Sequence, residues 1–238
     1  LWDPALKGLL IIGLVVGVLQ QITGINSVLA YATVIFERVG GTGATDDISF
    51  MQTMLVGLVN LVATVVALLL IDRVGRRPLL IFGTAGIAQS LMIAAYGFHA
   101  ADSAMSSPWV LAGLLGFVAC FAVSLGPGMW VLLSEIFPNR VRALAISCVG
   151  LVNSTVCFVV QFVFPWEMKN LGGTGTFLIY AAFALVGLVL LVKMLPETRG
   201  VPDGLPLSRA KTLQAPPEEL ARMRKETENT LRKMLRFT

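Results

Sequence analysis

Three amide side chains stand close together in one apolar stretch of this sequence. Gln20, Gln21 and Asn26 lie between about Leu9 and Ile35, in the segment Gln-Gln-Ile-Thr-Gly-Ile-Asn. An amide that faces lipid without a hydrogen-bond partner is costly, because nothing in the hydrocarbon replaces the water that it loses. The three side chains must therefore face a polar surface or a polar ligand.

The spacing of these amides predicts a break in the helix that carries them. At about 100° per residue, Gln21 lies about 100° and Asn26 about 240° from Gln20, so a straight helix would point them in different directions. They converge only if the helix breaks, and Thr23-Gly24 is the easiest place because glycine tolerates unusual backbone angles. A broken membrane helix with polar groups at mid-depth is typical of a substrate cavity. The alternative is that the amides hold neighbouring helices together.

The composition of the chain is that of a membrane protein. Of its 238 residues, 56% are hydrophobic and 13% are charged, whereas soluble domains carry about a quarter charged residues. The net charge of +4 would favour nucleic acid in a soluble protein. Here the positive residues stand at the ends of apolar stretches and in the C-terminal segment, so the lipid bilayer explains them and we expect no nucleic-acid partner.

Neither the cysteines nor the start of the sequence indicates a functional site. Cys120, Cys148 and Cys157 all lie within apolar stretches, and we interpret them as small buried hydrophobic residues, not as a disulfide or zinc set. The sequence starts at Leu1, with no signal peptide before the first apolar stretch. We therefore expect the chain to be a fragment.

Six stretches are long enough to cross about 30 Å of hydrocarbon at about 20 residues each. The expected spans are 6–36, 48–71, 78–99, 109–137, 142–166 and 173–195. The fourth is interrupted at Gly126-Pro127-Gly128, because Pro127 lacks a backbone donor and crowds the carbonyl of Val123. We expect the sixth to be a peripheral packing helix. The pattern predicts an all-α integral membrane protein with a six-helix bundle over residues 1–195.

Lysine and arginine in the short loops predict the orientation of this bundle. Most of these residues fall on one side, and only Arg38 and Lys169 fall on the other. The positive-inside rule then places both ends of the chain in the cytoplasm, and we expect a multi-pass protein of the plasma or inner membrane. Residues 196–238 form the expected cytoplasmic tail, with a short amphipathic helix over 218–237.

No catalytic arrangement is found in the sequence. The single histidine, His99, lies at an expected membrane boundary, and no Ser/His/Asp set, metal-ligand spacing or phosphate loop occurs. We therefore expect neither an enzyme nor a bound metal or other cofactor. No ionisable residue lies near the middle of an expected span, so the chain lacks the buried carboxylate that proton relays use.

Two charged turns stand at the expected cytoplasmic ends of the helices. Asp72 accompanies Arg76 and Arg77 between the second and third spans, and Glu135 accompanies Arg142 between the fourth and fifth. Anchoring of the helix ends by positive charge would explain the arginines but not the carboxylates beside them. A carboxylate within reach of arginines in each turn indicates instead a network of ion pairs that can break during motion.

Four motifs in this order resemble the C-terminal half of a sugar porter of the major facilitator superfamily. The likeness is greatest to bacterial proton-coupled pentose and hexose symporters, and it covers residues 5–200. The motifs are Gln20-Gln-x-Thr-Gly-Ile-Asn26, Asp72-Arg-x-Gly-Arg-Arg77, Gly126-Pro-x-x-Trp-Val-Leu-Leu-Ser-Glu-Ile-Phe-Pro138 through Arg142, and Pro196-Glu-Thr-Arg-Gly200. The resemblance implies one half of a twelve-helix fold, an N-terminal six-helix half as partner, and transport of a monosaccharide by alternating access.

The resemblance also assigns roles to single residues. It implies a ring-stacking role for Trp130 under the sugar and an outer-gate role for Tyr31. It implies hydrogen bonds to sugar hydroxyls from Gln20, Gln21, Asn26, Asn60 and Asn153. Amides suit neutral polyols because they both donate and accept, and an aromatic face suits the apolar C–H side of a pyranose.

Some positions depart from the family pattern. Ser154 stands where the family often has an aromatic residue, and Ala30 precedes Tyr31 where it often has a second tyrosine. Ala122 stands where facilitative glucose carriers often have Glu, which favours the bacterial branch. A transporter-like sugar sensor that binds without transport is the alternative function. A sensor usually needs a long cytoplasmic extension, and residues 196–238 are short for that role.

Overall fold

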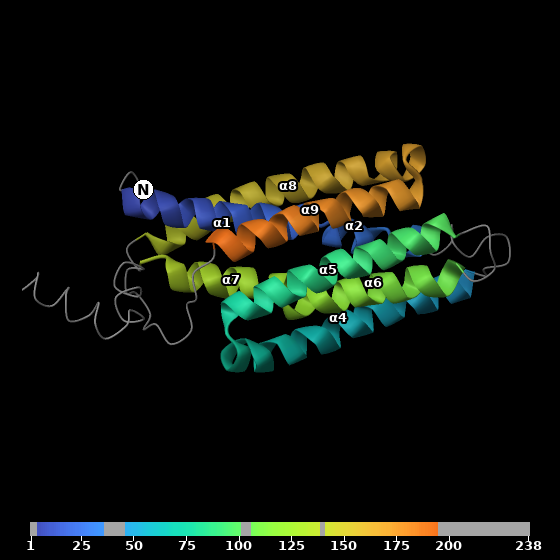
Figure 1. The fold of residues 1–238 in the computed structure, drawn as a ribbon, viewed down its shortest axis with the longest axis horizontal. Helices are drawn as coiled ribbons and strands as arrows, with labels where there is room; N and C mark the ends of the chain where they lie inside the picture. The colour runs from blue at the N-terminus through green and yellow to red at the C-terminus, as the bar shows by residue number, and fades with distance from the viewer. Residues whose placement is uncertain (1–3, 36–45, 101–105, 139–140, 195–238) are drawn as a thin grey trace, which may run out of the picture.

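The computed structural model describes residues 4–35, 46–100, 106–138 and 141–194, and these are helical almost throughout (Figure 1). Within these ranges, six helical segments are long and apolar enough to cross a membrane. The helices are α1 (Pro4–Ile22), α2 (Ile25–Ala30), α4 (Asp46–Val74), α5 (Arg76–His99), α6 (Ser106–Val123), α7 (Leu125–Ile136), α8 (Arg142–Asn170) and α9 (Gly172–Met194). The expected tail over 196–238 lies outside the described residues.

The helices lie side by side along one axis. α5 packs against α6 and α9, α4 packs against α6, and α1 packs against α8. In Figure 1, α8 lies at one edge of the bundle and α4 at the other. The centre is filled by side chains that are fully buried, among them Phe117, Leu125, Met129 and Phe177. These contacts make the described residues one helical bundle.

The first span breaks at Thr23-Gly24, as the amide spacing predicts. Gly24 has a φ of 81°, in the left-handed region that only glycine enters readily. Its N–H donates to the carbonyl of Gln21 at 3.0 Å, and Thr23 Oγ1 donates to the carbonyl of Gln20 at 2.9 Å. These local bonds satisfy backbone groups that the break would otherwise leave open.

The fourth span breaks at Ser124, before the predicted segment Gly126-Pro127-Gly128, so that prediction is wrong in position. α6 ends at Val123 and α7 begins at Leu125, which places Pro127 in the first turn of α7. Proline is tolerated there because the N–H groups of a first turn have no partner within their helix. Ser124 Oγ completes the end of α6 by donating to the carbonyl of Cys120 at 2.6 Å.

α9 has a second role besides peripheral packing. Its lipid-side face is exposed, with Val189 52% accessible, as expected of an outer helix. On the opposite side, Tyr180 is only 3% exposed, and its ring lies directly against Gly24 of the first span. Besides packing at the periphery of the bundle, α9 thus also supports the break between α1 and α2.

Candidate functional site

Four of the predicted amides meet in one hydrogen-bonded group, which we call the amide network: Gln20, Gln21, Asn26 and Asn153. Gln21 Nε2 donates to Asn153 Oδ1 at 3.1 Å, and Asn26 Nδ2 donates to Gln21 Oε1 at 2.6 Å. Asn153 Nδ2 donates to Gln20 Oε1 at 2.9 Å. The break at Thr23-Gly24 thus brings together side chains that a straight helix would separate.

Gln20 also connects the two broken spans. Its Nε2 donates to the carbonyls of Leu125 at 2.9 Å and of Gly126 at 3.2 Å, both in the first turn of α7. Asn153 Nδ2 from α8 donates in addition to the carbonyl of Gly17 at 3.0 Å. The amide network therefore lies where the breaks of the first and fourth spans are adjacent, and it joins α1, α2, α7 and α8.

The members of the network differ in how much bonding capacity they have left. Gln20 Oε1 accepts from both Gln21 and Asn153, and its Nε2 donates to two carbonyls. Gln20, Gln21 and Asn153 are at most 7% exposed. Asn26 is only half-buried, and no described residue donates a hydrogen bond to its Oδ1. Asn26 is therefore the member that can accept a hydrogen bond from a ligand without breaking the network.

Trp130 lies beside the network without belonging to it. It stands one helical turn after Gly126, and its side chain is 46% exposed. A Cβ on Gly150 would lie 4.0 Å from Trp130 Cη2, so the indole reaches α8 about one turn before Asn153. The ring therefore offers an accessible aromatic face near the amides.

Asn60 is the predicted site residue that the structure does not join to this group. It lies half-buried on α4, and within the described part of the chain its side chain has no hydrogen bond to the amide network. α4 packs mainly on α6, whereas α1 packs on α8. Asn60 thus belongs to a different wall from the four connected amides.

Two sulfur atoms touch the network, although the sequence did not single them out. Cys157 Sγ accepts from Asn26 Nδ2 at 3.3 Å and from Gln161 Nε2 at 3.0 Å. Met129 Sδ lies 3.8 Å from Asn153 Nδ2. Cys157, like Cys120 and Cys148, is a half-buried free thiol, and its two hydrogen bonds give it a polar role that its interpretation as a small hydrophobic residue missed. Its position four residues after Asn153, on the same helix face, is the signal that could have identified it.

Tyr31, the expected outer gate, stands at the end of α2. Its ring stacks on Phe164 with a centroid separation of 5.4 Å, and Phe164 stacks on Tyr180 at 6.2 Å. The hydroxyl of Tyr180 donates to Glu167 Oε2 at 2.8 Å. A row of three aromatic rings therefore links Tyr31 to the residue that packs on Gly24.

At the other end of the bundle, Arg76 and Glu135 form an ion pair between α5 and α7. Arg76 Nη2 lies 2.7 Å from Glu135 Oε1, and the two side chains are 16% and 17% exposed. Arg76 Nη1 donates in addition to the carbonyl of Ile71 at 3.3 Å, at the end of α4. The structure thus joins two members of the predicted ion-pair network across three helices.

The other members of that network occupy different places. Arg77 Nη2 donates to the carbonyl of Val192 at 3.3 Å, near the end of α9. Arg142 Nε donates to the carbonyl of Phe137 at 3.2 Å. The side chain of Asp72 lies outside the described residues. The arginines here therefore cap the carbonyl ends of helices as well as pairing with a carboxylate.

Comparison with known proteins identifies the family. The sequence matches the family model described as "Sugar (and other) transporter" over residues 2–203. It is 34% identical over 201 residues to the D-xylose-proton symporter of Escherichia coli K12. The aligned region covers 81% of this chain and 39% of that protein. It is 34% identical over 199 residues to the glucose transporter GlcP of Staphylococcus epidermidis, with coverages of 83% and 44%. The chain thus spans less than half the length of these relatives.

The fold matches solved structures of the same kind. The proton:xylose symporter XylE bound to 6-bromo-6-deoxy-D-glucose aligns with a TM-score of 0.71 at 34% identity, over 80% of this chain and 40% of that chain. An inward-open structure of XylE from E. coli gives a TM-score of 0.70 at 33% identity, with coverages of 82% and 40%. These matches confirm an all-helical membrane bundle that corresponds to part of a major facilitator fold, in a family of transporters and not of enzymes. The chain belongs to the sugar porter family of the major facilitator superfamily.

Proposed function

We propose that residues 4–194 form the C-terminal six-helix bundle of a monosaccharide transporter and that the amide network lies in one wall of its sugar site. The observation that carries this proposal is the meeting of four amides at two adjacent helix breaks. Interrupted membrane helices are used where irregular backbone and polar groups line a substrate cavity. The alternative, that the amides only hold helices together, explains Gln20 and Asn153 but leaves the open Oδ1 of Asn26 without a purpose.

The chemistry of this wall suits a neutral polyol. Asn26 Oδ1 accepts from a hydroxyl, and the half-exposed indole of Trp130 packs against the apolar C–H face of a sugar ring. The charged groups described in the spans stand near helix ends, as Arg76 and Glu135 do. No fixed charge at the network therefore selects for an ionic substrate. Gln21 and Asn60 contribute further contacts in this proposal, Asn60 from a different wall on α4.

Transport in this proposal works by alternating access and needs a second bundle. Facilitator-type carriers hold their substrate between two six-helix halves that rock against each other, and this chain spans about two fifths of its relatives. The ion pair of Arg76 and Glu135 closes one end, which the excess of arginine assigns to the cytoplasm. Tyr31 gates the other end.

The orientation of the bundle in the membrane can be tested by labelling. A membrane-impermeant thiol reagent should label Asn170→Cys from outside and Arg73→Cys only after permeabilisation.

The test separates sugar binding from helix packing. In the whole transporter, Asn26→Ala should weaken equilibrium binding of sugar roughly three- to tenfold, because one hydrogen bond to a neutral partner contributes about 0.5–1.5 kcal/mol. The thermal unfolding midpoint should fall only slightly, because Asn26 is half-buried and its loss removes one hydrogen bond from the buried Gln21 Oε1. Gln20→Ala should lower that midpoint more, because it leaves both Gln21 and Asn153 with an unmade bond.

The matched control is Asn170→Ala. Asn170 is exposed, and among the described residues its side chain bonds only to its own helix, at the carbonyl of Trp166. Binding should be unchanged in this variant. If Asn26→Ala lowers the unfolding midpoint and leaves sugar binding intact, the amides serve packing and the proposed site is wrong. Sugar counterflow in vesicles then distinguishes a transporter from a sugar sensor, which would bind sugar and show no counterflow.

A further inference from the structure

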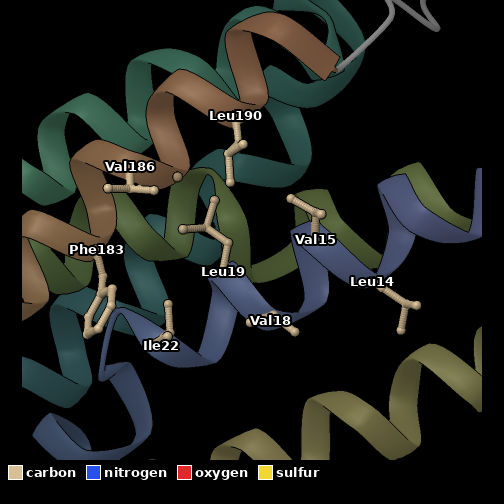
Figure 2. Close-up of a pocket in the computed structure, with 9 residues that line it drawn as sticks. Leu14, Val15, Val18, Leu19, Ile22, Phe183, Val186 and Leu190 are labelled. Carbon is tan, nitrogen blue, oxygen red and sulfur yellow. The ribbon is translucent and has the colours of Figure 1, made fainter.

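An apolar groove runs along the surface between α1 and α9 (Figure 2). Its volume is about 290 Å³, and every residue that lines it is apolar. Figure 2 shows Leu19 of α1 and Leu190 of α9 pointing toward each other, with Ile22 and Phe183 at one end. None of the lining residues belongs to the amide network, so the groove is a separate feature of the bundle.

The length of the groove matches the hydrocarbon of one leaflet. On α1 it extends from Leu14 to Ile22, a rise of about 12 Å at about 1.5 Å per residue. On α9 it extends from Leu190 to Phe183, a rise of about 10 Å. Half of a bilayer core is about 15 Å thick. The groove can therefore hold most of one extended acyl chain, with its deep end near the break of the first span.

Three cationic residues stand near the shallow end of the groove. Lys193 follows Val186 by seven residues, and Lys7 precedes Leu14 by seven, so each lysine lies two helical turns from a lining residue and on the same helix face. Both lysine side chains are exposed. Arg77 lies at this end as well, where it binds the carbonyl of Val192. An apolar channel thus opens beneath a group of cations.

We propose that this groove binds an acyl chain of an anionic phospholipid, whose phosphate contacts Lys193 and Lys7. The lipid belongs to the leaflet at the end of the bundle that carries Arg76 and Glu135. The apolar lining takes the acyl chain, and the lysines take the headgroup, because cations beside a membrane surface attract acidic lipids. A second copy of this chain fits less well, since a two-fold contact over the groove would bring the lysines of both copies together.

The experiment is native mass spectrometry of the purified whole transporter titrated with phosphatidylglycerol or phosphatidylcholine of identical acyl chains. Phosphatidylglycerol should bind at least fivefold more tightly. Val186→Trp should reduce the adducts of both lipids at least threefold, because the new ring fills the groove. Val186 is 58% exposed, so this ring does not enter the core. Lys193→Gln, alone and with Lys7→Gln, should weaken the binding of phosphatidylglycerol at least threefold and that of phosphatidylcholine less, because choline already offsets the charge of its phosphate.

Two matched controls stand outside the groove. Leu178→Trp places the same ring on the same helix at a position that is 49% exposed. Lys169→Gln removes an exposed lysine at the opposite end of the bundle. Neither should change lipid binding. Equal affinity for the two lipids, or equal effects of Val186→Trp and Leu178→Trp, would overturn the proposal. A loss of dimers with unchanged lipid adducts in Val186→Trp would overturn it too, in favour of a second copy as the occupant.

Discussion

Gly24 and Tyr180 lie in direct contact across the bundle: a Cβ on Gly24 would stand 2.7 Å from Tyr180 Cε2. The break between α1 and α2 is therefore set from both sides. The backbone adopts a φ of 81°, which suits glycine, and the buried ring of α9 leaves no room for a side chain. This contact, together with the hydrogen bonds of Thr23 and Gly24, holds the break that places Asn26 beside Gln21.

Gly24→Ala should consequently destabilise the protein. A left-handed conformation costs an L-residue about 1–2 kcal/mol, and the overlap with Tyr180 adds to that cost. We expect a lower unfolding midpoint in detergent and weaker sugar binding in the whole transporter. Gly8→Ala on α1 is the control, because nothing lies within 4 Å of a Cβ there, and alanine raises helix propensity. Equal midpoints for the two variants would contradict the role of the contact.

The sequence predicted the first break well and the second one poorly. At Thr23-Gly24 the prediction rested on geometry, because three amides on one helix can converge only through a break. At Pro127 it rested on a helix-breaking residue, and proline is equally compatible with the first turn of a new helix. The observed break therefore lies at Ser124 and not at Pro127. Its position depends on tertiary packing, which no local sequence pattern reveals.

Contacts between residues far apart in the sequence could not be predicted either, because they also depend on tertiary packing. Tyr180 is the one tyrosine in a featureless apolar span, and no local pattern shows that it packs on Gly24 or stacks on Phe164. Asn153 was assigned to the site by resemblance alone, and the structure supplies its partners. Asn60 received its role in the same way, and the described residues do not connect it to the other amides.

Trp130→Ala should weaken sugar binding with little loss of stability. Pairs of aromatic rings contribute about 0.5–1.5 kcal/mol beyond burial, and taking the same size for an indole against a sugar ring, we expect roughly a three- to tenfold higher dissociation constant in the whole transporter. Trp130 is 46% exposed, which limits the cost to folding. Trp130→Phe should restore most of the affinity, since a flat ring remains.

Trp109→Ala is the control for this change. Trp109 is 47% exposed and packs edge-on against Tyr96 at 6.2 Å, at the opposite end of α6 from the break. Isothermal titration of both variants with the same sugar gives the comparison. If Trp109→Ala weakens binding as much as Trp130→Ala does, the indole at 130 has no specific role.

Glu135→Gln should slow transport while leaving sugar binding nearly intact. The pair of Glu135 and Arg76 joins α7 to α5 at 2.7 Å, and an ion pair that breaks in one conformation shifts the balance between two states. Arg73→Gln removes an exposed charge from the same end of the bundle and should change neither quantity. Counterflow rates and equilibrium binding, measured on the same preparations, test this. Lost binding with a normal transport rate would count against a gate at Glu135.

The isolated chain should not transport sugar. The open groups of the proposed site, Asn26 Oδ1 and the face of Trp130, need a second wall, and residues 1–238 should aggregate or dimerise where that wall is absent. The described carboxylates of the spans stand near helix ends, as Glu135 and Glu167 do, so we also expect no proton uptake at mid-depth by this bundle alone. Uptake of labelled xylose and glucose into liposomes that contain residues 1–238 should equal uptake into empty liposomes. Saturable uptake that unlabelled sugar inhibits would show that one bundle suffices, and the two-bundle mechanism proposed for this chain would be wrong.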